Sequence, residues 1–129
     1  MDGSLEVVIL PVRDVDASKR FYASQLGFAV DLDMGEGENR FVQLTAAGSG
    51  CSVQLKPGDD TGGRPALVFV VADVDVARAE LAGAGVAVSP VQHFEGADRV
   101  DGRGGPWNSF VFFDDPDGYS WTIQERPAD

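Results

Sequence analysis

The feature that most constrains the fold is an internal repeat, because the same landmarks occur twice in the same order along the chain. Each copy holds an apolar run, an Asp-Val-Asp triplet, a glycine-centred segment and a closing strand-like segment. The paired segments are 6–12 with 65–71, 14–16 with 73–75, 26–30 with 84–88, and 50–55 with 118–123. Landmarks that recur in one order indicate a duplicated module rather than chance similarity. The chain is therefore predicted to contain two copies of one supersecondary unit.

The first copy reads as a strand, a helix and three further strands. The apolar run 6–12 has strand length, and either Asp14 or Asp16 is suited to cap a helix. Apolar residues at helical spacing predict that this helix runs over 18–26, and Gly27 is placed to end it. The three strands that follow are predicted at 28–33, 40–45 and 51–56.

The second copy begins in the same way and then departs from the first. An apolar strand is predicted over 65–71, and a helix follows Asp73. A longer insertion lies between Ser89 and Asn108, and it reads as irregular because it is rich in glycine. Long loops in compact domains are usually functional or disordered, so His93 and Trp107, which lie in this insertion, become candidate functional residues.

The segment 110–125 predicts a closing hairpin. Its centre, Asp115-Pro116-Asp117-Gly118, has turn chemistry, because proline presets φ at the second position and glycine accepts a positive φ. After the turn, small polar residues alternate with large apolar ones, so one face of the strand is polar. The polar residues are Ser120, Thr122 and Gln124.

Composition excludes several classes of function. With 129 residues the chain is predicted to form one domain with a real core. A net charge of −11 disfavours nucleic acid, and it fits either a cationic ligand or simple solubility. No apolar run approaches the roughly 18 residues of a spanning helix, so no membrane association is expected. The start of the chain lacks a signal-peptide pattern and Cys51 is the single cysteine, which together predict a cytoplasmic protein.

In combination, these motifs resemble the vicinal oxygen chelate superfamily, which includes glyoxalase I, extradiol dioxygenases and bleomycin-binding proteins. The motifs are Val12-Arg13-Asp14-Val15-Asp16, Phe21-Tyr22, Leu26-Gly27-Phe28 and Asp115-Pro116-Asp117-Gly118. The resemblance covers the chain as one domain of class α+β. It implies two βαβββ modules, over 5–56 and 65–126 with a linker at 57–64, whose sheets form a half-open curled sheet around a cavity. It also implies a homodimer.

The resemblance places the metal ligands of the family's enzymes at four positions, and none of them carries a metal-binding residue here. In each module, the first position lies seven residues before the aspartate of the helix entry, and the second lies four residues after a turn glycine. These positions are Val7, Gln54, Ala66 and Thr122. Divalent metals in such sites need imidazole or carboxylate ligands. We therefore expect no metal and no cofactor.

Three classes of function remain open. The first is a metal-independent protein that binds or sequesters an aromatic or cationic, antibiotic-like small molecule in the cavity. The residues expected to line its site are Val7, Ser52, Gln54, Ala66, His93, Trp107, Ser120, Thr122 and Gln124. The second is a glyoxalase-like lyase or isomerase with His93 or Glu125 as the acid–base group. The third is a structural or regulatory dimer whose cavity is filled by its own side chains.

Overall fold

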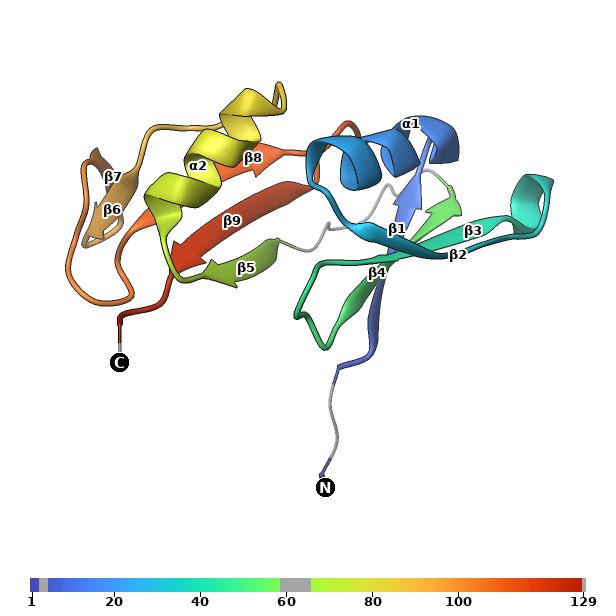
Figure 1. Cartoon of the computed structure of the whole chain (residues 1–129), viewed down its shortest axis with the longest axis horizontal. Coiled ribbons are helices and arrows are strands. Elements are labelled where there is room, and N and C mark those ends of the chain that lie inside the picture. The colour runs from blue at the N-terminus through green and yellow to red at the C-terminus, as the bar shows by residue number, and fades with distance from the viewer. Residues whose placement is uncertain (3–4, 59–65, 129) are drawn as a thin grey trace. The chain divides into compact units, whose positions relative to one another are not determined.

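A computed structural model describes residues 1–2, 5–58 and 66–128 (Figure 1). The chain forms two compact units, Met1–Arg64 and Pro65–Asp129, and each has one sheet and one α-helix. The α+β class and the division into two sheets agree with the prediction. Within the described ranges, no helix is long and apolar enough to cross a membrane.

The first unit is a four-stranded sheet with the strand order β1-β4-β3-β2. The strands are β1 (Val7–Val12), β2 (Ala29–Met34), β3 (Phe41–Thr45) and β4 (Ser52–Pro57). The helical segments are α1 (Val15–Arg20), a turn of π-helix at η1 (Phe21–Gln25), and a 3-10 turn at η2 (Gly37–Asn39). Strand β1 runs parallel to β4, and the other two pairs are antiparallel. Of the predicted linker, Pro57 ends β4, Gly58 donates a hydrogen bond to the carbonyl of Val12, and 59–64 lie outside the described residues.

The first helix begins where the sequence predicts but does not stay α-helical. The carboxylate of Asp14 caps it by accepting a hydrogen bond from the backbone N–H of Ala17 at 3.0 Å, so Asp14, not Asp16, is the cap. After Arg20 the backbone widens into the π-helical turn, in which the N–H of Leu26 donates to the carbonyl of Phe21. Gly27 then ends the helix with a φ of +74°. The predicted helix is therefore present, but its second part is π-helical and not α-helical.

One face of the first sheet is buried and the other is open. Alternate residues of a strand point to opposite faces, and α1 packs against β3 and β4. Several residues on the helix side are completely buried. They include Leu10, Val12, Val42, Leu44 and Leu55. The residues between them in the sequence are more exposed, as the 50% exposure of Ile9 shows.

The second unit is a five-stranded sheet with the strand order β5-β9-β8-β6-β7. Its strands are β5 (Leu67–Val71), β6 (Gln92–Glu95), β7 (Asp98–Asp101), β8 (Phe110–Asp114) and β9 (Ser120–Glu125), and its helix is α2 (Val74–Gly83). The predicted insertion at 89–108 is not irregular throughout, because β6 and β7 form a hairpin with Gly96 in its turn at a φ of +65°. This module therefore has one strand more than the predicted βαβββ order.

The second sheet also has a buried face and an open face. Helix α2 packs on β8 and β9, where Val111, Trp121 and Ile123 are buried (Figure 1). The predicted turn between these strands is present. One carboxylate oxygen of Asp115 accepts the N–H groups of Asp117 and Tyr119 at 2.9 and 2.8 Å, and Gly118 has a φ of +85°.

Candidate functional site

In the first unit, the predicted ligand residues share the open face of the sheet. Val7 lies opposite Ser52, and Ile9 lies opposite Gln54. Gln54 also pairs with Gln43 on β3, and its Nε2 donates to Oε1 of Gln43 at 3.3 Å. These register pairs place Val7, Ser52 and Gln54 on one side of the sheet, away from α1.

A row of polar side chains crosses this face beside Gln54. The hydroxyl oxygens of Ser52 and Thr45 lie 2.5 Å apart, and the hydroxyl of Thr45 donates to the carboxylate of Asp31. Because the Thr45 hydroxyl donates its hydrogen bond to Asp31, its oxygen must accept the hydrogen bond that the Ser52 hydroxyl donates. The register of β2 against β3 shifts between Val30 and Leu32, which allows Asp31 to reach this face. Asp31 was not among the predicted site residues, because alternation alone cannot reveal a bulge.

In the second unit, four predicted ligand residues lie on the open side. Ser120, Thr122 and Gln124 alternate along β9, and Thr122 lies between Val68 on β5 and Phe112 on β8. Ala66 directly precedes β5 and is exposed. Trp107 is connected to this face through its backbone, since Nε2 of Gln124 donates to the Trp107 carbonyl at 2.9 Å. Trp107 is 52% exposed, and its backbone has a φ of +63°.

An aromatic cluster on the same face was not predicted. Phe110 lies opposite both Gln124 and Gln92, so Phe110 and Phe112 share the face of Thr122. The ring of Phe94, which follows Gln92 by two residues on β6, contacts both of them. The run Phe110-Val111-Phe112-Phe113 was a visible signal, but only the pairing shows which phenylalanines point away from the helix.

His93 lies on the opposite face of β6 from Gln92 and Phe94. Its Nδ1 is 2.8 Å from the carbonyl oxygen of Gly102, and its Nε2 is 3.2 Å from a carboxylate oxygen of Glu95. Within the described part of the unit, this histidine holds the hairpin and the following loop together. His93 therefore does not share the open face with Phe94, because residues 92–95 form a strand and not the irregular loop that the sequence predicted.

Glu125, the other acid–base candidate, is engaged in structural contacts. One carboxylate oxygen accepts the backbone N–H of Val74 at 2.9 Å, and the other pairs with the guanidinium of Arg103. The hydrogen bond from Val74 lowers the pKa of Glu125, and Arg103 lowers it further against the opposing effect of burial. A general acid or base near neutral pH needs a raised carboxyl pKa, so this environment does not suit Glu125 to that role.

The family's metal positions do not fit a metal ion in either unit. The first unit offers Val7 and the neutral amide of Gln54, and the second offers Ala66 and the hydroxyl of Thr122. None of these is an imidazole or a carboxylate, the ligands that divalent transition metals prefer. Among the described residues, no group of three or more His, Cys, Asp or Glu side chains could hold a metal ion.

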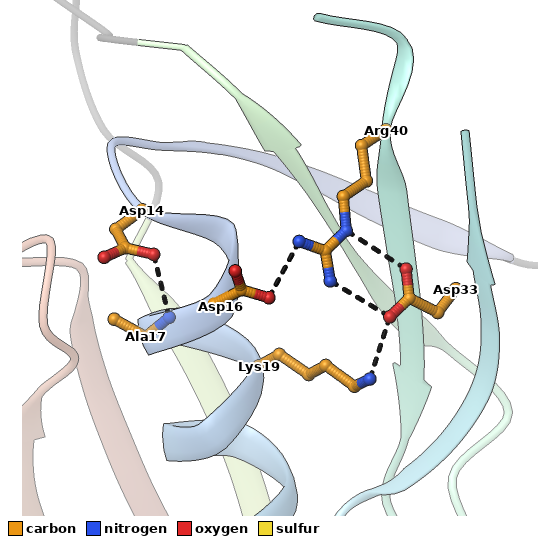
Figure 2. A network of polar contacts seen from close by, with 6 residues as sticks. All are labelled: Asp14, Asp16, Ala17, Lys19, Asp33 and Arg40. Carbon is orange, nitrogen blue, oxygen red and sulfur yellow. Dashed lines mark hydrogen bonds and ion pairs between the residues drawn. The ribbon is translucent and has the colours of Figure 1, made fainter. Parts of the chain in front are cut away.

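A charge network of the first unit lies outside its open face. Figure 2 shows the guanidinium of Arg40 between Asp16 on α1 and Asp33 on β2, with Lys19 also on Asp33. Asp33 lies opposite Val42 and therefore faces the helix. Arg40 lowers the pKa of Asp33 to about 2, with a second contribution from Lys19. This network connects α1 to the sheet edge and takes no part in the candidate site.

Comparison with known proteins agrees with this architecture. The family model of the Glyoxalase/Bleomycin resistance protein/Dioxygenase superfamily matches residues 4–123. No curated protein matches the chain.

Solved structures match over nearly the whole chain. TnmS3, an antibiotic binding protein from Streptomyces sp. CB03234, has a TM-score of 0.75 and 26% identity, and the match covers 97% of each chain. A glyoxalase/bleomycin resistance protein from the same organism has a TM-score of 0.71 and 28% identity, covering 94% of this chain and 99% of that one. A superfamily member from Sphaerobacter thermophilus DSM 20745 has a TM-score of 0.75 and 24% identity, covering 97% and 98%. The chain belongs to the Glyoxalase/Bleomycin resistance protein/Dioxygenase superfamily.

Proposed function

We propose that this protein is a metal-independent binding protein for an aromatic, antibiotic-like small molecule, with a binding site on the open face of a sheet. The observation that carries the proposal is the exposed apolar surface on these faces. In the second unit, Val68 is 60% exposed, Val70 44% and Phe94 37%. In the first unit, Ile9 is 50% exposed. Exposed apolar residues that gather on one side of a sheet are typical of a ligand or partner surface.

The polar groups of these faces suit the same role. Gln54, Thr122 and Gln124 are neutral, and each can both donate and accept a hydrogen bond. They can therefore orient a ligand without the cost of burying a charge. A mostly apolar surface with a few such groups is the usual composition of a small-molecule site. Ser52 in the first unit and Trp107 in the second are further residues that the sequence predicts to line the ligand site.

The relatives favour binding over catalysis. TnmS3, at 26% identity over 97% of this chain, is described as an antibiotic binding protein. The four positions at which the family's metalloenzymes hold their ligands carry side chains without imidazole or carboxylate. In addition, Glu125 is engaged with α2 and Arg103, so it is not free to transfer protons. These observations support a ligand-binding protein rather than a lyase or isomerase.

The test is titration calorimetry with a panel of aromatic antibiotics and simpler aromatic compounds. We expect Gln54→Leu and Thr122→Val each to weaken binding of a ligand by about five- to a hundredfold, through the loss of one hydrogen bond. Elemental analysis of protein purified without a chelator is expected to find no stoichiometric transition metal. A metal that is lost in Gln54→Leu would contradict the proposal.

A pair of valines provides a matched control. Val68 on the open face is 60% exposed and Val76 on α2 is 54% exposed, so serine at either position removes a similar exposed apolar group. Val68→Ser should weaken binding, and Val76→Ser should leave it unchanged. Equal binding by both variants would show that the open face of the second unit is not the binding surface.

A further inference from the structure

We infer that Arg99 gives the open face of the second unit a site for the anionic group of an aromatic acid. This inference rests on the proposed function and names the class of ligand. The group that suggests it is a guanidinium stacked on a phenylalanine ring, beside the residues already assigned to that face. Cζ of Arg99 lies 3.8 Å from the centroid of the Phe112 ring.

Three phenylalanine rings form the apolar part of this site. The centroid of Phe94 lies 5.2 Å from that of Phe110 and 6.2 Å from that of Phe112, and Phe110 and Phe112 are stacked at 5.9 Å. Such edge and stacked arrangements are the favoured geometries of aromatic pairs. A planar aromatic ligand can add to this cluster in the same geometries. The cluster therefore favours an aromatic ring over an aliphatic one.

The β6–β7 hairpin positions Arg99 over these rings. Arg99 on β7 lies directly opposite Phe94 on β6, so both side chains lie on one face of the hairpin. A guanidinium that stacks on an aromatic ring uses the face of its plane. Its N–H groups point outward in that plane, and they form the fork that binds a carboxylate with two hydrogen bonds. An arginine that lies over the Phe112 ring can therefore keep its N–H donors for a carboxylate.

Arg99 differs from Arg40 and Arg103 in its electrostatic partners. Arg40 pairs with Asp16 and Asp33, and Arg103 pairs with Asp75 and Glu125. Over the ranges that the structure describes, Arg99 has no carboxylate within ion-pair distance, although it lies in a hairpin with three acidic neighbours. Those neighbours are Glu95, Asp98 and Asp101. An exposed arginine that lies over a ring and has no carboxylate partner among the described residues is suited to an anion from outside.

The neighbouring groups define the shape of the ligand. Phe112 lies opposite Thr122, and Phe110 lies opposite Gln124, so hydroxyl and amide groups lie directly beside the aromatic cluster. In this site the ring of the ligand contacts Phe94 and its carboxylate reaches Arg99. The other polar groups of the ligand then lie near Thr122 and Gln124. The ligand class is thus a planar aromatic carboxylate with further hydrogen-bonding groups.

The experiment compares an acid with its uncharged counterpart on the full chain. The probes are 2-naphthoate and 2-naphthamide, titrated by calorimetry at low and at high salt. We expect the acid to bind about five- to tenfold more tightly than the amide at low salt, with the preference reduced at high salt because Arg99 is exposed. Arg99→Gln should abolish the preference, and Arg99→Lys should retain only part of it, because lysine lacks the planar fork.

Arg20→Gln on α1 is the matched control, since it removes one exposed positive charge as Arg99→Gln does. It should leave the preference unchanged, which separates a local contact from the effect of net charge. Thermal melting of each variant checks that it is folded. If the acid and the amide bind equally tightly, and Val68→Ser still weakens the binding of both, the inference is overturned and the proposed function is left intact. Failure of both probes to bind at millimolar concentration would overturn the inference and count against the proposed function as well.

Discussion

Glu125 near the C-terminal end of β9 accepts a hydrogen bond from the backbone N–H of Val74, the first residue of α2, at 2.9 Å. The two residues are 51 positions apart in the chain. The first N–H groups of a helix have no partner within it, and one carboxylate oxygen of Asp73 accepts the N–H groups of Asp75 and Val76 but not that of Val74. A carboxylate from the last strand therefore completes the cap of the second helix and connects it to the sheet.

This contact predicts a role for Glu125 in stability and not in catalysis. Glu125→Ala leaves the N–H of Val74 without its acceptor and breaks the pair with Arg103. We expect a loss of about 1–3 kcal/mol in the free energy of unfolding. Glu125→Gln keeps an acceptor for the N–H of Val74. Its free energy of unfolding should therefore lie between those of the alanine variant and the wild type. Urea denaturation, monitored by circular dichroism, measures the free energy of unfolding of both variants.

Glu95→Ala is the control for that series. The side chain of Glu95 is 65% exposed and pairs with His93 at the surface, so its loss should change the free energy of unfolding by less than about 0.5 kcal/mol. A Glu95 variant as unstable as Glu125→Ala would show that the contact with Val74 is unimportant.

Gly104 is predicted to be intolerant of any side chain. A Cβ at this position would lie 2.3 Å from the carbonyl oxygen of Asn108 and 2.8 Å from Cβ of His93. We expect Gly104→Ala to destabilise the protein by about 1–3 kcal/mol, because backbone must move to make room. A Cβ on Gly105 would meet no described atom within 4 Å beyond its chain neighbours, so Gly105→Ala should be nearly neutral. Thermal melting of both variants tests this, and equal melting temperatures would contradict it.

The ion network around Asp33 predicts how the stability of the fold changes with pH in the acidic range. Arg40 lowers the pKa of Asp33 from 3.8 to about 2 in the folded chain. A carboxyl whose pKa is depressed on folding stabilises the fold above its unfolded pKa, and this contribution disappears as the pH falls through the folded pKa. The melting temperature of the wild type should therefore exceed that of Asp33→Asn near pH 7, and the difference should shrink between about pH 4 and about pH 2. Glu38→Gln, at an exposed position, is the control and should leave the melting temperature at pH 7 close to that of the wild type.

Much of the fold could be predicted from local patterns. The repeat of Asp-Val-Asp triplets located both helix starts, and Asp14 and Asp73 are indeed the capping residues. Alternation along β9 correctly separated Thr122 and Gln124 from the buried Trp121 and Ile123. These features depend on residues close together in the chain, and local sequence carries that information.

The parts that could not be predicted depend on contacts between distant segments. The β6–β7 hairpin has mixed polar and apolar residues, so neither strand shows a clear period, and only Gly96 signals the turn. As a result, the face on which His93 lies could not be predicted. The stacking of Arg99 on Phe112 and the capping of Val74 by Glu125 join positions that no spacing rule relates.

The last prediction concerns assembly, and its basis is the outer strand of the first sheet. β2 lies at the edge of that sheet, and all six of its residues are exposed. Val30, Leu32 and Met34 are 41%, 42% and 53% exposed. An edge strand offers unpaired backbone N–H and C=O groups, and apolar residues on it favour a protein partner. We propose that a second copy of the chain covers β2, and we expect a homodimer at tens of micromolar concentration in sedimentation experiments.

A charge on this strand tests where the second copy binds. Leu32→Lys places an ammonium group on the proposed interface, where burial is costly, and should shift the protein towards monomer by at least about tenfold in the dissociation constant. Val76→Lys introduces the same group on α2, at a position with 54% exposure, and should leave the dimer intact. A monomeric wild type at high micromolar concentration would exclude the homodimer. If Leu32→Lys leaves the dissociation constant unchanged, the interface lies on another surface. A lysine buried at the interface without a charged partner would have to weaken the dimer.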